Sequence, residues 1–255
     1  MKWRSLLPGI VAGAVALSCG EVPTLDEGIA YISPIILPAP AVAIGDTLRD
    51  SLGVATPLRI EAFGRNGEQL ADPAATFLPT VVPSPITIND AGFVTASDTV
   101  STVQTVQLVG RVGNKLQTTT ASLLVVPNAD SLARTTSEEV EAALPAADTI
   151  RVTVTGVNRS GTRVGVPGII VRYRIARAYG SGDMTALLTM DGGTASGPDS
   201  QAAVDTTDAS GVASRTLVVA GESVDSVVVF VRARSLRGTP LKGDSLHFVL
   251  LRAKP

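Results

Sequence analysis

Two residue types with versatile chemistry, cysteine and histidine, occur once each in the chain, as Cys19 and His247. A single cysteine excludes an internal disulfide. One cysteine and one histidine together are too few for a metal site built from several Cys and His ligands. Asp244 and Ser245 lie just before His247, so the residue types of an acyl-transfer triad are close in sequence. Ser245 and His247 are two apart on an expected strand, with no nucleophile elbow. We therefore expect no catalytic residue, and a histidine at the rim of the last strand.

The residues ahead of Cys19 have the pattern of a signal peptide. Lys2 and Arg4 form a short basic region, and the stretch 6–17 is apolar and uncharged. A transmembrane helix needs about 20 apolar residues, whereas a shorter stretch behind basic residues is typical of an export signal. We expect residues 1–18 to be removed on export.

The segment 16–20, ALSCG, resembles the bacterial lipobox, in which small residues precede a cysteine that becomes the lipidated N-terminus. The resemblance implies cleavage between Ser18 and Cys19, and a diacylglycerol plus a third acyl chain on Cys19. Two or more acyl chains are enough for stable membrane attachment. Gly20, in place of an aspartate, favours the outer over the inner membrane of the cell envelope. The alternative is an ordinary secretory signal with a cysteine nearby by chance.

Composition excludes other classes of partner. The chain has 255 residues, of which 21 are basic and 23 acidic, so it lacks the basic surplus of a nucleic-acid-binding protein. Hydrophobic residues make up 45%, which argues against intrinsic disorder, and aromatic residues only 4%. We expect no cofactor, no metal ion and no nucleic-acid partner.

After a short polar tether, runs rich in valine, isoleucine and threonine alternate with clusters of Gly, Pro, Asn and Asp, the pattern of an all-β sandwich. The expected strands are 57–63, 86–89, 92–96, 102–112, 116–126, 131–135, 149–157, 168–175, 212–219, 224–233 and 244–251. Alternation predicts which side chains face the core. These are Leu58, Ile60 and Ala62, then Ile150, Val152 and Val154, and finally Ile169, Val171, Tyr173 and Ile175. Val106, Leu108 and Gly110 also share one face, but Gln104, Thr105 and Gln107 do not all follow the alternation, so the sequence leaves the register of that strand open.

Helical periodicity is almost absent. The exception is the segment 136–144, TSEEVEAAL, in which Thr136 and Glu139 have the spacing of a capping box. It is too short to be stable alone, and Pro145 ends it. We expect a loop with one helical turn.

The first half resembles the group 2 bacterial Ig-like domains. The resemblance rests on the segments 44–47 (IGDT), 64–67 (GRNG) and 88–96 (INDAGFVTA). It departs from that family by lacking the tryptophan often found before the mid-domain turn, and we expect Phe77 to occupy that part of the core. The resemblance implies a β-sandwich over 39–127.

The second half resembles the invasin-type, group 1 bacterial Ig-like domains. The strand, turn and strand within 154–173 carry part of the resemblance, and the block 207–213, TDASGVA, carries the rest. In that block the Asp208 side chain is expected to cap the turn, and Gly211 to supply a positive φ. The resemblance implies a second β-sandwich over 128–255.

These patterns divide the chain into a lipoprotein signal peptide over 1–18, a lipidated tether over 19–38 and two tandem Ig-like β-sandwiches over 39–127 and 128–255. No long Gly/Ser linker follows Pro127, so we expect the two sandwiches to be joined stiffly.

Three sets of polar residues are candidate ligand groups. Asp205 and Asp208, with Asp191 and Asp199, can gather Ca²⁺, but no Asp-x-Asp-x-Asp-Gly spacing is present and we expect turn chemistry instead. The glycine-rich segment 180–197 is either a binding surface or a mobile excursion between strands. Six arginines punctuate the strands and form either a face for an anionic ligand or, as we expect, a solvated face: Arg151, Arg172, Arg174, Arg215, Arg232 and Arg234.

In the resembled families such domains bind partners or space other domains and have no catalytic residues. The sequence therefore predicts a non-enzymatic cell-envelope lipoprotein, held to a membrane by lipid on Cys19, with a structural, adhesion or protein-interaction role and an unidentified protein or glycan partner. The alternative is a carbohydrate- or polymer-binding accessory lipoprotein of an uptake system. It is less favoured because Tyr31, Tyr173 and Tyr179 are the only tyrosines.

Overall fold

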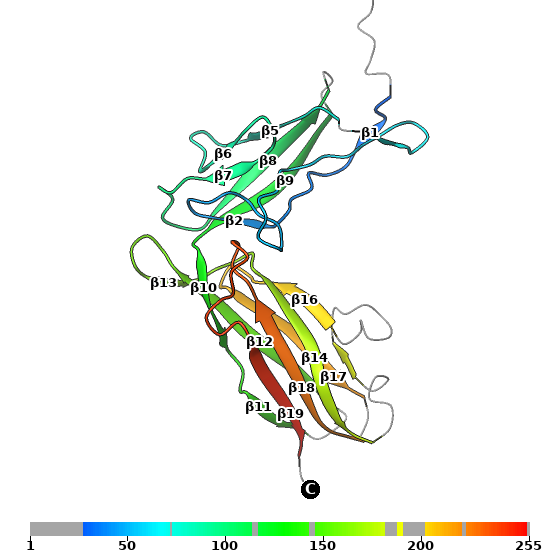
Figure 1. Ribbon diagram of the computed structural model, residues 1–255, viewed down its shortest axis with the longest axis vertical. Helices are drawn as coiled ribbons and strands as arrows, with labels where there is room; N and C mark the ends of the chain where they lie inside the picture. The colour runs from blue at the N-terminus through cyan, green and yellow to red at the C-terminus, as the bar shows by residue number, and fades with distance from the viewer. Residues whose placement is uncertain are drawn as a thin grey trace, which may run out of the picture.

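The computed structural model describes residues 28–71, 73–113, 117–142, 146–181, 188–190, 202–220 and 223–253. Within these ranges every regular element is a β-strand, and no helix is long and apolar enough to cross a membrane. Figure 1 shows two bodies stacked along the long axis, with β1 to β9 in one and β10 to β19 in the other. We call them the first and the second sandwich. The all-β prediction is confirmed.

The first sandwich is built from short strands around one long hairpin. Its strands are β1 Tyr31–Ile32, β2 Ala41–Ala43, β3 Ala62–Phe63, β4 Gln69–Leu70, β5 Ala75–Pro79, β6 Ile86–Ile88, β7 Val94–Ala96, β8 Gln104–Val112 and β9 Gln117–Val126. One sheet has the order β2-β9-β8-β5, and β1-β3-β4 and β6-β7 pair separately. Val106 and Leu108 of β8 are buried while Gln107 between them is exposed, which gives the register that the sequence left open. Phe77 is buried in this core, as expected.

The expected strand 57–63 is wrong in extent, although its burial is right. Leu58, Ile60 and Ala62 are buried, yet only Ala62 and Phe63 belong to a strand. The preceding backbone bonds to irregular segments instead: the Leu58 N–H donates to the Gly92 carbonyl at 2.9 Å. A two-residue period reports which side chains are buried, whereas a strand also needs a straight neighbour to pair with.

The second sandwich has two sheets that enclose a larger core. Its strands are β10 Ala129–Arg134, β11 Glu139–Ala142, β12 Ala146–Val157, β13 Arg163–Gly165, β14 Ile170–Gly180, β15 Leu188–Met190, β16 Ala202–Thr206, β17 Val212–Val219, β18 Val224–Ala233 and β19 Leu246–Arg252. The sheet orders are β10-β12-β17-β15, with β13 beside β12, and β11-β19-β18-β14-β16. The predicted inward residues of β12 and β14 are all buried. This confirms the face assignments of both strands.

The strand order identifies the type of sandwich. In both halves, the last two strands form an antiparallel pair and an early strand runs parallel to the last one, β2 beside β9 and β11 beside β19. In the second sandwich, the two sheets have the ABED and CFG orders of an immunoglobulin-like domain, with β10-β12-β17-β15 as the first and β14-β18-β19 as the second. The sheet that contains the last two strands therefore has the same arrangement in both halves, β2-β9-β8-β5 in the first and β11-β19-β18-β14 in the second.

The expected helical turn at 136–144 is wrong. Residues 139–142 form strand β11, which pairs in parallel with β19, and the Val249 N–H donates to the Glu138 carbonyl at 2.8 Å. Val140 packs against the second core. A short helix has little stability of its own, so a sheet edge that offers both hydrogen bonds and apolar contact outweighs the capping signal. Residues 143–145 lie outside the described residues.

The turn at 208–211 forms as the sequence predicts. One carboxylate oxygen of Asp208 accepts hydrogen bonds from the backbone N–H groups of Ser210 at 2.8 Å and Val212 at 3.0 Å. Gly211 has a φ of 78°, and a Cβ there would lie 2.5 Å from the Val154 carbonyl oxygen. Only glycine satisfies both demands, because a side chain would strain the backbone and collide with the neighbouring strand.

Tyr173, at the centre of β14, is 1% exposed, and its hydroxyl has no hydrogen-bond partner among the described residues. Burial, with a smaller effect from the Asp205 carboxylate, raises the pKa of Tyr173 well above its ordinary value. An unpaired buried hydroxyl costs about 1–3 kcal/mol of desolvation. The buried hydroxyl of Tyr173 therefore lowers the free energy of unfolding, whereas the buried ring raises it.

We predict that Tyr173→Phe raises the free energy of unfolding by about 1 kcal/mol, since it removes an unpaired hydroxyl and keeps the ring. Urea denaturation measures the difference. The control is Tyr179→Phe, whose side chain is 51% exposed and which is expected to change stability by less than about 0.5 kcal/mol. A loss of stability in Tyr173→Phe would mean that the hydroxyl is hydrogen-bonded.

Candidate functional site

The lipidation site predicted from sequence, Ser18 and Cys19, lies outside the described residues, so the lipid anchor stays a prediction. The same holds for Asp191, Asp199 and most of the glycine-rich segment 180–197. Among the described residues, no group of three or more Cys, His, Asp or Glu side chains is placed to hold a metal ion.

His247 lies exposed on the outer face of β19, as expected. Its ring meets the ring of Phe230 edge to face, with 4.5 Å between centroids. The Ser245 side chain is also exposed, and no described contact joins it to His247. The arrangement is that of a rim histidine packed on an aromatic neighbour.

Asp205 serves a structural role. It forms an ion pair with Arg215 at 3.3 Å and accepts a hydrogen bond from the Ser214 N–H at 2.8 Å. Arg215 is half-buried, so its assignment to the solvated face was wrong: β17 directs it toward Asp205 at the edge between the two sheets. The other five predicted arginines are exposed.

The junction between the two sandwiches brings together residues far apart in sequence. Only Pro127 and Asn128 separate β9 from β10. Ala41 and Val126, from the first sandwich, are buried in the core of the second. A Cβ on Gly168 would lie 2.7 Å from the Cβ of Ala41, so the two bodies touch at backbone distance here. The apolar side chains at the junction are therefore part of the hydrophobic core of the second sandwich.

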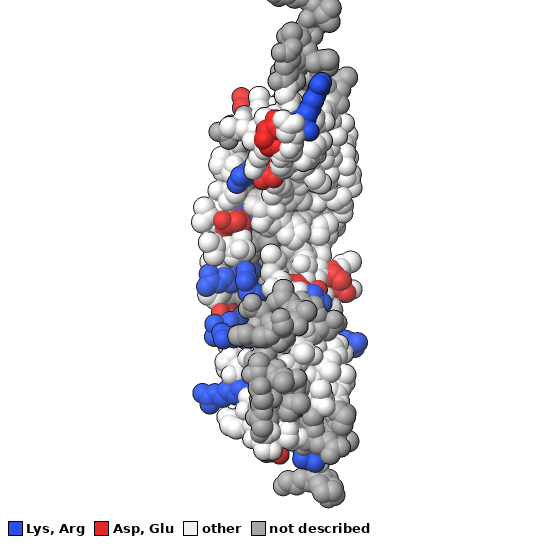
Figure 2. All heavy atoms as spheres, turned by 90° about the vertical axis from the view of Figure 1, so that its right-hand side faces the viewer, with Lys and Arg blue, Asp and Glu red and all other residues white. Residues whose placement is uncertain are grey.

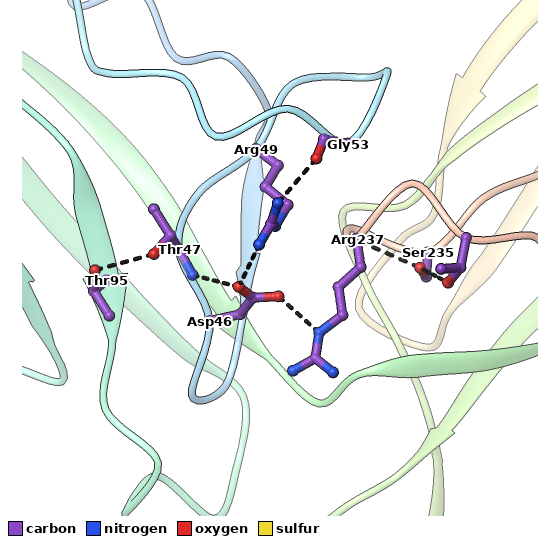
Figure 3. A network of polar contacts seen from close by, with 8 residues as sticks. Asp46, Thr47, Arg49, Gly53, Thr95, Ser235 and Arg237 are labelled. Carbon is purple, nitrogen blue, oxygen red and sulfur yellow. Dashed lines mark hydrogen bonds and ion pairs between the residues drawn. The ribbon is translucent and has the colours of Figure 1, made fainter.

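Asp46 forms the polar part of the junction (Figure 3). It follows β2 in a tight turn. Its Oδ1 accepts hydrogen bonds from the Thr47 N–H at 2.7 Å and from Arg49 at 3.2 Å. Its Oδ2 accepts one from Nε of Arg237, in the β18–β19 loop of the second sandwich, at 2.7 Å. One carboxylate therefore joins its own loop to the other sandwich.

The environment of Asp46 favours its charged form. Its side chain is 13% exposed, and burial acts to raise its pKa. The hydrogen bonds from Thr47, Arg49 and Arg237 outweigh burial and hold the pKa of Asp46 below its ordinary value of 3.8. A carboxylate that accepts several charge-assisted hydrogen bonds is stabilised in this way.

Two glycines let the loops approach each other beside Asp46. Gly238 has a φ of 78°, and a Cβ there would lie 2.8 Å from the Cα of Gly53. Gly53 has a φ of 83°, and its Cβ would lie 2.7 Å from the Arg237 carbonyl oxygen. Arg49 also donates to the Gly53 carbonyl at 3.0 Å, which holds this loop in place. Any side chain at either glycine would push the sandwiches apart.

A third contact lies to one side of the junction, where Arg159 of the second sandwich donates to the Asp98 carbonyl at 2.8 Å. Three kinds of contact thus resist rotation between the sandwiches: an apolar one through Ala41, a polar one through Asp46, and one from Arg159. We call this junction the clamp. It comprises Ala41, Asp46, Gly53, Arg159 and Arg237 with their partners.

The sequence did not predict the clamp. Asp46 lies in the IGDT segment, which carries only a family resemblance, and Arg237 and Gly238 carry no signal beyond an ordinary turn. Their loop follows β18 and is shaped by its own hydrogen bonds, including one of 2.6 Å between the hydroxyls of Ser235 and Thr239. No local pattern reveals that this loop meets residue 46.

No protein-family model and no curated protein sequence matches the chain. Among solved structures, the Yersinia pseudotuberculosis adhesin InvE matches 90% of this chain at 16% identity with a TM-score of 0.35, and the chain spans 61% of that protein. Domains 4 and 5 of the S-layer protein SbsC match 88% of this chain and 97% of theirs, at 14% identity and a TM-score of 0.29. Human protocadherin-24 EC1-2 matches 89% of this chain and 99% of its own, at 12% identity and a TM-score of 0.24.

The fold class is confirmed: the strand order and the paired sheets define an all-β protein of two tandem Ig-like β-sandwiches. At such low identity and TM-scores, these matches assign no activity or partner to this chain. The assignments to group 2 and group 1, and the boundaries 39–127 and 128–255, remain predictions.

We predict that Asp46→Asn and Arg237→Gln each lower the free energy of unfolding by about 1–2 kcal/mol at neutral pH, because each breaks a charge-assisted hydrogen bond. The double variant is expected to lose about 1 kcal/mol less than the sum, as paired residues do. Urea titration of all four proteins measures the coupling. Additive losses would show that Asp46 and Arg237 are energetically independent.

The same comparison has a pH dependence. Because the folded state lowers the pKa of Asp46, its carboxylate contributes stability above its ordinary value of 3.8 and loses it as pH falls through the lower folded value. The stability difference between the wild type and Asp46→Asn should therefore be constant above about pH 5 and shrink below it. A difference unchanged down to pH 2 would contradict this account.

We predict that Gly238→Ala opens the clamp. The left-handed backbone at this position costs about 1–2 kcal/mol with any side chain. The new Cβ would also collide with the Cα of Gly53, and this collision is expected to displace one sandwich from the other. The control is Gly67→Ala, in the β3–β4 turn, with a φ of 81° and no atom within 4 Å of the added Cβ. Small-angle X-ray scattering should show a wider range of molecular shapes for Gly238→Ala alone. Equal profiles for both variants would contradict the prediction.

Proposed function

We propose that this chain is a lipid-anchored protein of the bacterial cell envelope that acts as a non-catalytic structural, adhesion or protein-interaction module. The observation that carries the proposal is the clamp, which joins the two sandwiches end to end into one elongated body (Figure 1). Spacing and presentation need a fixed distance and orientation between domains, and the three kinds of contact in the clamp supply that rigidity.

The path of the chain fits a spacer. In Figure 1, β1 lies toward the upper end of the molecule, and β11 and β19 lie toward the lower end. A lipid on Cys19 would attach on the N-terminal side of β1, so the second sandwich would be held away from the membrane by the length of the first. The clamp would keep that distance constant.

Membrane attachment is supported by the sequence. The lipobox-like segment 16–20 follows a basic and then an apolar region, and the sole cysteine of the chain lies at the position that lipidation requires. Gly20 supports the outer membrane as the destination. The alternative function, a carbohydrate- or polymer-binding accessory lipoprotein, is supported by a separate observation, the arginine-rich outer face of the second sandwich.

We predict that the wild-type protein, expressed in a Gram-negative host, sediments with membranes and has the mass of a chain beginning at Cys19 plus acyl chains. Cys19→Ala should lose both the acyl mass and the membrane association, because no thiol remains to accept the lipid. Intact-mass spectrometry of membrane and soluble fractions provides the measurement, and a density gradient separates outer from inner membrane.

The matched control is Ser18→Ala, which keeps a small residue at the cleavage position and should leave processing unchanged. A wild-type protein that is soluble and carries no acyl mass would refute the anchor. It would leave a secreted two-sandwich protein, and the tests of the clamp would be unaffected.

A further inference from the structure

The outer face of the sheet β11-β19-β18-β14-β16 carries five exposed arginines on two neighbouring strands and the turn after one of them. They are Arg172, Arg174 and Arg177 on β14, Arg232 on β18 and Arg234 just after it. We call this surface the arginine face. The residues between them, Val171, Tyr173, Val231 and Ala233, are buried, so the alternation of each strand directs the arginines outward together.

Strand pairing places like charges directly opposite each other. Arg172 of β14 pairs with Arg232 of β18 in the antiparallel register. Arg174 lies two residues along β14, about 7 Å away, opposite Phe230, and Phe230 lies opposite His247 of β19. A bulge after Ile175 places Arg177 opposite Val228 on the same face. The cationic groups therefore form a row along the sheet.

No carboxylate compensates this row within the described part of the chain. Arg49, Arg134, Arg163, Arg215 and Arg237 each form an ion pair with an aspartate or glutamate. None of the five arginines of the arginine face does so. Glu139 and Glu141 face the same side, but they lie on the far edge strand β11, with β19 and β18 between them and β14.

Like charges directly opposite each other on a sheet are destabilising. A fold that keeps such a pair, with Arg174, Arg177 and Arg234 beside it on the same face, bears a cost that its own stability does not require, which is typical of a binding surface. Figure 2 shows the molecule from the side, where blue groups gather along one edge of the lower sandwich.

We propose that the arginine face binds a linear anionic polysaccharide, one that carries carboxylate or sulfate groups at regular intervals. The inference deepens the proposed function, and rests on it, because it names the partner that the module would hold. A guanidinium binds a carboxylate or sulfate through two parallel hydrogen bonds, and a row of them matches a repeating polymer better than a single ion.

The shape of the face favours this partner over other polyanions. Single-stranded nucleic acids bind where successive aromatic rings offer stacking platforms. On β14 and β18, Phe230 is half-buried and packs against His247, which leaves Tyr179 as a single exposed ring beside the row. Double-stranded DNA is read by an element that enters a groove, and a sheet face does not protrude. An anionic membrane surface attracts lysines and arginines beside apolar anchors, whereas the arginines here stand on a rigid sheet.

The test measures binding of full-length protein, purified in mild detergent, to immobilised polygalacturonate and to dextran sulfate, with neutral dextran as the blank. The variant Arg172→Gln/Arg232→Gln removes the central pair and keeps side chains of similar length. We expect its affinity to fall about tenfold or more, as the loss of charge-assisted hydrogen bonds implies. Binding by the wild type should weaken as salt rises.

The matched control is Arg65→Gln/Arg111→Gln, which removes two exposed arginines of the first sandwich and changes net charge equally. It should bind like the wild type. A second readout is stability: the central variant should unfold at the same or a higher urea concentration than the wild type, because a like-charge pair is gone. A loss of stability would assign these arginines a structural role and overturn the proposal.

Other outcomes also overturn it. Equal binding by both double variants would show that net charge, and not the arginine face, attracts the polymer. Tighter binding to a single-stranded oligonucleotide, or to vesicles containing phosphatidylglycerol, would assign the face to nucleic acid or to lipid instead. Failure to bind either polysaccharide would refute the partner, while fractionation of the same preparation reports separately on the anchor.

Discussion

The carboxylate of Asp46 is shared between two loops that belong to different sandwiches, and the geometry of the whole molecule depends on it. Arg49 fixes the carboxylate within its own loop, and Arg237 reaches it from the other side at 2.7 Å. Because the side chain is 13% exposed, the charges are only partly screened by water. The glycines at 53 and 238 permit this approach. Without them the ion pair would have to span a wider gap.

The clamp also connects the two hydrophobic cores. Ala41 and Val126 belong to strands of the first sandwich, yet they are buried with the second core. The neighbouring Val42 points the other way and is buried in the first core. Strand β2 therefore serves both bodies, since successive side chains of a strand face opposite sides. A connection of two residues between β9 and β10 is short enough to keep this arrangement.

The second sandwich separates its roles by face. One end of it meets the first sandwich, its interior is closed by Tyr173 and the valines around it, and its outer face presents unpaired arginines. The same strand, β14, takes part in two of these roles, because Tyr173 points inward while Arg172 and Arg174 point outward. Stability and the proposed polysaccharide binding can therefore be altered independently, by substitutions at alternate positions.

What the sequence determined by itself was local. Alternating valine, isoleucine and arginine predicted the buried faces of β12 and β14, and Asp208 with Gly211 predicted a turn, because these features depend on neighbours within a few residues. Only the tertiary structure decided that residues 139–142 form a strand, since their partner β19 is more than a hundred residues away. The same holds for Asp46 with Arg237 and for Arg172 opposite Arg232. The register of the paired strands and the packing of the two sandwiches bring each of these pairs together. The spacing of the residues along the chain does not predict these contacts.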